Sequence, residues 1–294
     1  MTPDWIAADW GSSNLRVWAM QGDQILAHSA SDEGMGKLGA SEFEAALLRL
    51  ISGWLGAGVM PVIACGMVGS RQGWQEVPYR AVPCAPLQAG TLASVASIDA
   101  RISLQIVAGL KQTTPADVMR GEETQIAGAL AGLPGFDGVI CLPGTHSKWV
   151  DIAGGQVAGF RSFMTGELFA LLAEASVLRH GMGGAGWDDA AFEQAVAEAF
   201  TAPLAGTAAL FTLRAEGLLA GLPAASARAR LSGLLIGAEL VSARDFWAER
   251  PVVLIGAKAL SGLYAQALGL QGIDCQSFDA TACTLAGLSA ARLG

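Results

Sequence analysis

The chain has 294 residues, of which 52% are hydrophobic and 15% are charged. This composition excludes a disordered chain and is sufficient for sizeable cores, while the length favours two domains over one. The net charge of −8, without a long basic run, argues against binding to nucleic acid or to an anionic membrane. Apolar stretches are interrupted before they reach the about 18 residues of a membrane-spanning helix.

The N-terminus and the cysteines indicate the compartment. Residues 1–5 lack a basic segment that leads into an apolar one, so we expect no secretory signal and a cytoplasmic location. The five cysteines are widely spaced and include no C-x-x-C pair. This spacing argues against a disulfide framework or a zinc site and favours small buried apolar residues.

The first part of the chain predicts a hairpin-rich sheet. Strands are predicted over residues 5–9, 15–20 and 24–28, with a turn at Gly22 and Asp23. A helix is predicted from Ser41 to Trp54, because Ser41 and Glu44 form a capping box before an amphipathic run. A buried strand over 61–65 then leads into a glycine-rich loop over 66–74, which is long for a connection.

The remainder of the chain predicts mostly helices around a second sheet. Residues 84–101 give no clear signal and are expected to be irregular. Strands are predicted over 103–109, 138–142 and 252–255. Helices are predicted over 124–131, 165–175, 188–200, 208–220, 227–247, 258–268 and 280–293.

The pattern at the start of the chain recurs 133 positions later, from Gly11 to Gly144. The two tracts are Gly11-Ser12-Ser13-Asn14 and Gly144-Thr145-His146-Ser147. Each lies between two predicted strands and is followed by a glycine turn. A glycine followed by hydroxyl or amide side chains at a bend exposes backbone N–H groups that suit a phosphate. We interpret the pair as a first and a second phosphate loop, although either tract alone would be an ordinary Gly-Ser turn.

Asp9 precedes the first loop at the end of a predicted buried strand. A buried carboxylate is costly unless it meets a cation or hydrogen-bond donors. Because Mg²⁺ with its bound waters supplies both, the sequence predicts a magnesium site at Asp9. The second loop has Leu142 at the corresponding position, so it offers no such ligand.

These residues resemble the superfamily of sugar kinases, heat-shock ATPases and actin, in which each duplicated domain begins with such a hairpin. The resemblance implies an α/β fold of duplicated ribonuclease-H-like (actin-like ATPase) domains, as two lobes with a central cleft. We expect an N-terminal lobe over 1–117, able to pack against the helix at about 280–294, and a C-terminal lobe over 118–279. Residues 252–257 are similar to the superfamily's adenosine motif, which implies ATP with Gly256 beside the adenosine.

Five blocks narrow this resemblance to the 2-dehydro-3-deoxygalactonokinase family. They are residues 9–14, 66–74, 120–125, 143–149 and 163–168. The resemblance implies transfer of the ATP γ-phosphate to the 6-hydroxyl of 2-dehydro-3-deoxy-D-galactonate, with Mg²⁺ as cofactor. The sequence does not fix the epimer of the sugar acid or the oligomeric state, for which a homodimer is one option.

The chemistry requires a carboxylate that accepts the proton of the attacking hydroxyl. In related kinases this base lies at the start of the helix before the second phosphate strand, where this chain has Glu122 and Glu123. The relatives' spacing of carboxylate, amide and alanine fits Glu123, Gln125 and Ala127, so we favour Glu123. The alternative is that both carboxylates only stabilise the N-terminus of the helix.

A sugar acid brings a carboxylate, which Arg side chains bind in a bidentate manner. Arg71 in the glycine-rich loop is the leading candidate, and Ser70, Gln72 and Trp74 would complete a polar wall with one aromatic face. Further arginines expected near the substrate are Arg16, Arg120 and Arg161. The segment 33–37 would supply another side.

Within the second loop, His146 is expected to donate to a phosphate oxygen. Ser147 and Lys148 are neighbours in a strand and point to opposite faces, so we expect only one of them to reach the phosphates.

Two other functions stay open. The Gly-Glu-Glu segment before a glycine-rich loop also resembles exopolyphosphatases, in which water would be the acceptor. A non-catalytic ATP-binding regulator of the same superfamily is the third interpretation.

Overall fold

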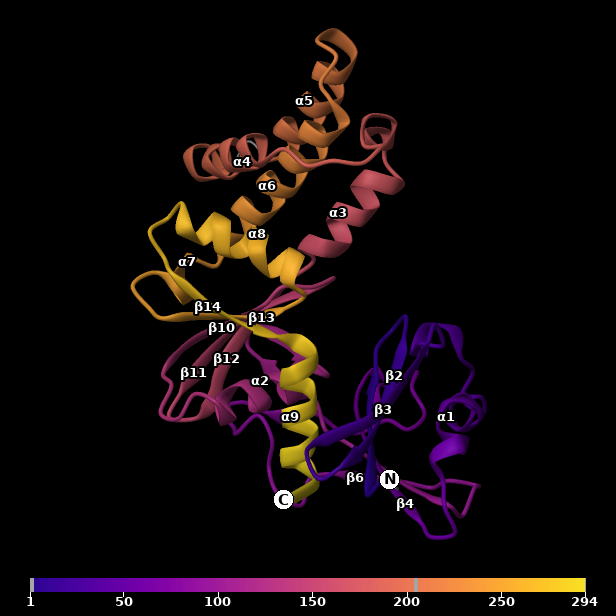
Figure 1. Ribbon diagram of the computed structural model, residues 1–294. Helices are drawn as coiled ribbons and strands as arrows, with labels where there is room; N and C mark the ends of the chain where they lie inside the picture. Colours follow the sequence, from indigo (N-terminus) through magenta and orange to yellow (C-terminus); the bar gives the residue numbers. More distant parts are fainter. Residues whose placement is uncertain (1–2, 204–205, 294) are drawn as a thin grey trace. The chain divides into compact units, whose positions relative to one another are not determined.

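The structure is a computed structural model that describes residues 3–203 and 206–293 (Figure 1). The chain divides into two compact units. The first unit comprises Met1–Phe136, Ala153–Gly159 and Asp279–Gly294, and the second comprises Asp137–Ile152 and Phe160–Phe278. The chain therefore leaves the first unit and returns to it twice.

The main sheet of the first unit has the strand order β3-β2-β1-β4-β7-β6. Its strands are β1 (Trp5–Trp10), β2 (Leu15–Gln21), β3 (Gln24–Ser31), β4 (Met60–Gly66), β6 (Ala93–Val95) and β7 (Ile102–Ile106). Strands β1, β2 and β3 pair antiparallel, whereas β1, β4 and β7 pair in parallel. The predicted hairpins, and the predicted strand over 61–65, are confirmed.

Different helices cover the two faces of this sheet. Ile6, Ala8 and Trp10 share a core cluster with residues of α1 (Phe43–Ile51). Trp5 and Ala7, which alternate with them, share another cluster with Leu288 of α9 (Ala280–Leu293). Because successive side chains of a strand point to opposite faces, burial of both faces produces the continuous apolar run of β1.

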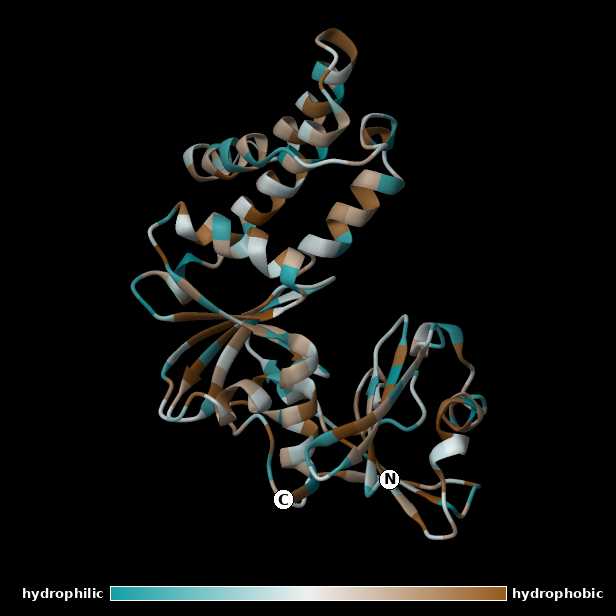
Figure 2. Cartoon of the chain, in the orientation of Figure 1, coloured by the Kyte–Doolittle hydropathy of each residue, from teal (hydrophilic) through white to brown (hydrophobic). Residues whose placement is uncertain are grey.

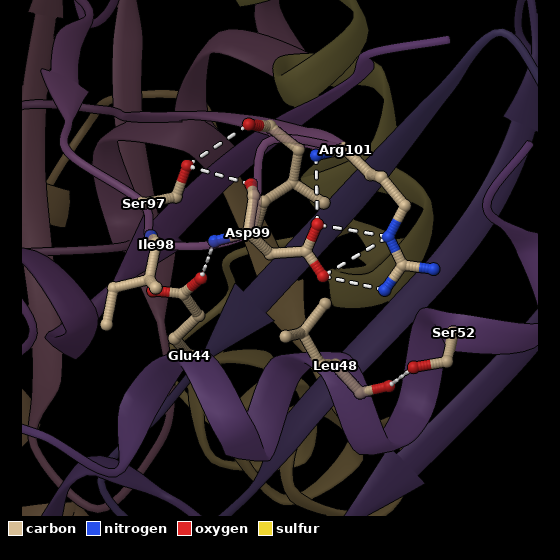
Figure 3. Close-up of polar contacts among 8 residues, drawn as sticks. Glu44, Leu48, Ser52, Ser97, Ile98, Asp99 and Arg101 are labelled. Atoms are coloured by element: carbon tan, nitrogen blue, oxygen red, sulfur yellow. Dashed lines mark hydrogen bonds and ion pairs between the residues drawn. The ribbon is translucent and has the colours of Figure 1, made fainter. Parts of the chain in front are cut away.

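The start of α1 differs from the prediction. The helix begins at Phe43 after Glu42, and no side chain caps its N-terminus. The expected capping box is wrong because the Glu44 carboxylate accepts hydrogen bonds from the backbone N–H groups of Ile98 (2.9 Å) and Asp99 (2.6 Å) instead (Figure 3). Glu44 therefore fixes the loop before β7 against the helix, a long-range contact that local spacing does not reveal.

The segment between β4 and α2 (Glu122–Ala131) is more ordered than predicted. Residues 84–101, expected to be irregular, contain β6, and the strand expected over 103–109 ends at Ile106. A three-stranded sheet follows, formed by β5 (Arg80–Ala81), β8 (Leu110–Thr113) and β9 (Ala116–Met119). It leads the chain directly to the acidic start of α2.

The second sheet repeats the topology of the first. Its order is β12-β11-β10-β13-β14, which corresponds strand for strand to β3-β2-β1-β4-β7. Its strands are β10 (Gly138–Leu142), β11 (Ser147–Ala153), β12 (Gln156–Phe163), β13 (Val252–Gly256) and β14 (Cys275–Asp279). Strand β10 pairs antiparallel with β11 and parallel with β13. The predicted internal duplication is confirmed at the level of strand order, and Figure 2 shows the hydrophobic colouring of these central strands.

The helices of the second unit are α3 (Thr165–Glu174), α4 (Asp189–Thr201), α5 (Gly206–Leu219), α6 (Ala224–Ser242), α7 (Arg244–Trp247) and α8 (Lys258–Gly269). Residues of α4, α6, α7 and α8 share a core cluster with β10, β11 and β13, whereas α3 and α5 pack with α4 and α6 in a separate cluster. The helix predicted over 227–247 is interrupted at Ala243, which separates α6 from α7. Among the described residues, none of the helices is long and apolar enough to cross a bilayer.

Two glycines allow α2 and α9 to pack closely in the first unit. A Cβ on Gly128 would overlap the backbone oxygen of Cys283, and one on Gly287 would overlap that of Thr124. This contact holds α2 in the first unit, so residues 118–136 pack there and the unit ends at Phe136, beyond the expected boundary at 117. That the two units are the functional lobes remains our proposal.

We expect Gly128→Ala to destabilise the protein by about 1–3 kcal/mol, because the new methyl group would overlap the backbone of α9 at Cys283. The matched control is Gly262→Ala in α8, where a Cβ meets nothing within 4 Å. Removing that glycine should raise stability by up to about 1 kcal/mol through helix propensity. Urea unfolding followed by circular dichroism measures both, and equal effects would show that α2 and α9 are not in close contact.

Candidate active site

The first phosphate loop is a tight bend between β1 and β2. The Gly11 N–H donates to the Asn14 carbonyl oxygen (2.9 Å), and Ser12, Ser13 and Asn14 are exposed. The loop thus offers two hydroxyls and an amide at the surface of the first unit, as the sequence predicts.

The segment 33–37, expected to border the sugar acid, lies directly against this loop. The N–H groups of Met35 and Gly36 donate to the carbonyl oxygens of Gly11 (3.0 Å) and Ser12 (2.9 Å). A Cβ on Gly34 would overlap the loop backbone. The segment therefore supports the shape of the phosphate loop.

Asp9 and Arg16 are directly opposite each other in the β1–β2 ladder and form an ion pair. The Asp9 side chain is 16% exposed, and its other oxygen lies 4.0 Å from the Sγ atom of Cys65 on β4. Arg16 also donates to the Thr281 hydroxyl of α9 (3.2 Å). Two of the candidate residues are thus together, with Arg16 bound to Asp9.

The acid pair begins α2 beside the end of β4. Gly66 (φ +91°) and Gly121 (φ +108°) both adopt backbone conformations that favour glycine, and a Cβ on Gly121 would lie 3.3 Å from the Cα of Gly66. Because Cys65 is paired with Asp9 in the β1–β4 ladder, this close approach places Glu122 and Glu123 in the neighbourhood of Asp9. Both acidic residues share the first unit with the first phosphate loop.

The two glutamates differ in burial. Glu122 is partly exposed and accepts from the Arg120 N–H (2.9 Å). Glu123 is fully buried and accepts from the Gly121 N–H (2.7 Å) and the Thr124 hydroxyl (3.0 Å). Burial, and then the negative charge of Glu122, raise the pKa of the Glu123 carboxyl to about 7, although these hydrogen bonds oppose the shift.

The polar residues of the glycine-rich loop over 66–74 differ in their exposure to solvent. Arg71 is exposed, its Nε atom lies 3.6 Å from a Glu76 oxygen, and Gln72 is also exposed. Ser70 is buried, and its hydroxyl has no hydrogen-bond partner among the described residues. Trp74, expected to face the substrate, packs beside Trp10 and Phe43 at the edge of the core.

Arg120 is a buried cation below this loop. Its guanidinium lies 4.2 Å from the ring centre of Tyr79 and donates to the Val77 carbonyl oxygen (2.7 Å). Its Nε and Nη1 atoms have no hydrogen-bond partner within the described part of the chain. A Cβ on Gly69 would lie 2.8 Å from Nη1, so the guanidinium is packed against the loop backbone.

The second phosphate loop is supported by the start of α3 in the second unit. Thr145 and His146 are exposed, and the His146 Nε2 atom lies 2.6 Å from Glu167 Oε2. The Glu167 N–H donates to the Thr145 carbonyl oxygen (2.9 Å), and a Cβ on Gly166 would overlap the Gly144 backbone. The helix N-terminus therefore lies against the loop.

Ser147 differs from its predicted role. It is fully buried, and its hydroxyl donates to Glu239 Oε2 (2.6 Å), while Lys148 is also buried. Sequence reasoning missed Glu239, although a single acidic residue within the apolar run 231–241 of a helix is a usable signal.

A cavity of about 430 Å³ opens beside the second loop, within the second unit. It is lined by Gly144 and Thr145 and by mostly apolar residues of α3, α6 and α8. Gly256 ends β13, and a Cβ there would lie 2.7 Å from the Ser261 hydroxyl. Arg161 is not at this cavity's wall; it forms a bidentate pair with Asp245 (2.9 Å).

A family model described as 2-keto-3-deoxy-galactonokinase matches residues 9–291. The chain belongs to this family. It is 41% identical over 293 residues to a probable 2-dehydro-3-deoxygalactonokinase of Rhizobium meliloti, covering 97% of this chain and 95% of the relative. It is 39% identical over 285 residues to the 2-dehydro-3-deoxygalactonokinase of Escherichia coli, covering 93% and 92%.

Solved structures agree with the fold. A crystal structure from Sinorhizobium meliloti, of a protein assigned as a 2-dehydro-3-deoxygalactonokinase, superposes with a TM-score of 0.91 at 40% identity, covering 98% of this chain and 97% of that chain. The (R)-2-hydroxyglutaryl-CoA dehydratase component A of Acidaminococcus fermentans superposes with a TM-score of 0.51 at 13% identity, covering 99% and 96%, which shows the fold alone. The predicted actin-like ATPase fold of this family member is confirmed.

The buried carboxyl of Glu123 predicts a pH-dependent stability. Its pKa of about 7 in the folded protein exceeds the value of 4.5 expected in an unfolded chain. The folded state therefore holds the proton more tightly, and the free energy of unfolding falls as pH rises from about 4.5 to about 7, by roughly 3 kcal/mol. Glu123→Gln should remove this fall.

Urea unfolding at pH 4.5, 6, 7 and 8 tests the predicted fall in stability, with Glu76→Gln, a change at an exposed carboxylate, as the control variant. The difference between wild type and Glu123→Gln should grow in favour of the variant across this range. Parallel stability profiles for all three proteins would contradict the raised pKa.

Proposed function

We propose that the protein is a kinase that transfers the γ-phosphate of ATP to the 6-hydroxyl of 2-dehydro-3-deoxy-D-galactonate. The observation that carries the proposal is the family match over residues 9–291, supported by two relatives named 2-dehydro-3-deoxygalactonokinase. The structure of the first unit also supports the proposal. Its phosphate loop follows β1, and its acid pair, Glu122 and Glu123, begins α2 beside the end of the neighbouring strand β4.

We assign the general base to Glu123. Its pKa of about 7 is close to the working pH, where a base is most effective. Because Glu123 is fully buried, the residues that cover it must open when the sugar acid binds, and catalytic hydrogen bonds often form only in the substrate complex. Glu122, which is partly exposed, is the alternative base.

We assign Mg²⁺ to Asp9. No group of three or more His, Cys, Asp or Glu side chains in the described residues could hold a metal by itself. Mg²⁺ fits a single carboxylate, since it commonly binds through one or two carboxylates, waters and substrate phosphates. When bound, it would neutralise phosphate charge, and Arg16 would hold the Asp9 carboxylate in place through their ion pair.

We assign the nucleotide to the second unit. The cavity beside Gly144 and Thr145 has the size and the mostly apolar lining of a site for a flat base. The exposed Thr145 and His146 would face the phosphates, and Gly256 ends the neighbouring strand. Ser147 would act from inside the protein, through its bond to Glu239.

We assign the sugar-acid carboxylate to Arg71, with Ser70 and Gln72 beside it. The Arg71 side chain is 81% exposed, and its pair with Glu76 is a surface contact of about 0–1 kcal/mol, so it can turn to an anion at little cost. Arg120 would fix the loop from below, while Arg161 is held by Asp245. A cytoplasmic location and a homodimer remain part of the proposal.

Mg-ATP turnover measured as ADP release, with and without 2-dehydro-3-deoxy-D-galactonate, tests the function. We expect ADP release to depend on the sugar acid. Equal ADP release without it would indicate a phosphohydrolase, and no release in either case, despite ATP binding, would indicate a regulator. Either result would contradict the kinase.

Glu123→Gln should lower kcat by about 10²- to 10⁴-fold, the range for loss of a general base, while the Kd for Mg-ATP stays within about twofold because the nucleotide is assigned to the second unit. Glu122→Gln is the matched control and should retain most turnover. If instead Glu122→Gln is inactive and Glu123→Gln is active, the base is Glu122.

A further inference from the structure

Glu239 is a buried carboxylate that accepts four side-chain hydrogen bonds in the second unit. It lies in α6 and is 3% exposed. Its Oε2 atom accepts from Ser147 (2.6 Å), Tyr264 (2.8 Å) and Thr165, and its Oε1 atom accepts from the Trp149 indole (2.7 Å). Three of the four donors therefore converge on Oε2 and one on Oε1, and through them this residue connects α6 with β11, α3 and α8.

Three of these donors belong to the walls of the nucleotide cavity or to its phosphate loop. Thr165 and Tyr264 line the cavity. Ser147 ends the second phosphate loop, directly after the exposed Thr145 and His146. Glu239 itself is not among the cavity-lining residues, so it acts only through its partners.

The contact through Thr165 also fixes the start of α3. Thr165 is the first residue of that helix, and the next residue, Gly166, lies so close to Gly144 that a Cβ would overlap the loop backbone. Binding of the Thr165 hydroxyl by Glu239 therefore sets how the helix N-terminus meets the phosphate loop.

The hydrogen bond from Tyr264 to Glu239 fixes the Tyr264 ring in the cavity wall. Burial, and then the negative charge of Glu239, raise the pKa of the Tyr264 phenol well above its usual range, so the phenol keeps its proton and donates. A donor fixed on a buried carboxylate holds the ring at one orientation in the cavity wall.

A buried carboxylate contributes less to stability than its hydrogen bonds alone suggest. Removing it from water is costly, and well-packed apolar residues in its place are often as stable or more so. A role in fixing the geometry of the neighbouring site is therefore the better explanation of this residue.

We propose that Glu239 is the positioning residue of the nucleotide site, which holds the second phosphate loop, the start of α3 and the Tyr264 wall in their binding geometry through four hydrogen bonds. This inference rests on the assignment of the nucleotide to the second unit. It requires no contact between Glu239 and the nucleotide.

Isothermal titration of the full chain with Mg-ATP tests the inference on Glu239→Gln, Tyr264→Phe and the double variant. Glu239→Gln should raise the Kd for Mg-ATP about tenfold, the size of one lost hydrogen bond to a charged group. Tyr264→Phe should raise it less. Since both changes weaken the same contact between Tyr264 and residue 239, their effects on the Kd should be less than additive in the double variant.

Trp247→Phe is the matched control for stability. The Trp247 indole is buried in the same unit, and its N–H donates to the Leu240 carbonyl oxygen (2.8 Å) rather than to a carboxylate. We expect it to lower Tm by an amount similar to Glu239→Gln and to leave the Kd for Mg-ATP unchanged. The KM for the sugar acid should stay within about twofold in every variant.

A Kd for Mg-ATP in Glu239→Gln within twofold of wild type would overturn the positioning role. So would an equal rise in Kd for Trp247→Phe, because binding would then follow stability alone. Folded wild-type protein that does not bind Mg-ATP would overturn the proposed function itself, and it is recognised without any variant.

Discussion

The close approach of Gly66 and Gly121 is the constraint from which the arrangement of Asp9, Glu122 and Glu123 in the first unit follows. Each glycine has a positive φ angle, and a Cβ on Gly121 would lie only 3.3 Å from the Cα of Gly66. The approach fixes the start of α2 at the end of β4, next to the strand that carries Asp9. The glycine contacts between α2 and α9 then hold the body of that helix in the first unit.

The two units have the same strand order but use their buried glutamates in different ways. Burial, and then the charge of the neighbouring Glu122, raise the pKa of the Glu123 carboxyl to about 7 even though it accepts two hydrogen bonds, which fits its proposed role in proton transfer. Glu239 accepts four side-chain hydrogen bonds from β11, α3 and α8, which fits its proposed role in positioning. In the roles that we propose, one fold thus provides an acid–base group and a positioning group from the same residue type.

The sequence predicted the features that depend on local pattern. Alternation and turn residues gave the hairpins, and the recurrence from Gly11 to Gly144 gave the duplicated sheet. The predictions were wrong where the role of a side chain depends on a partner far away in the sequence. Glu44 binds the loop before β7 instead of capping its helix, and Ser147 is buried and bonded to Glu239. The acid pair was found by motif, but the burial that separates Glu122 from Glu123 depends on tertiary packing.

Transfer of a phosphoryl group from ATP to the sugar acid is measured directly by ³¹P NMR of the reaction products. Purified protein with Mg-ATP and 2-dehydro-3-deoxy-D-galactonate should yield ADP and a phosphomonoester signal that couples to the protons of the terminal CH₂ group, as expected for a 6-phosphate. Inorganic phosphate as the only other product would contradict the account, because water would then be the acceptor.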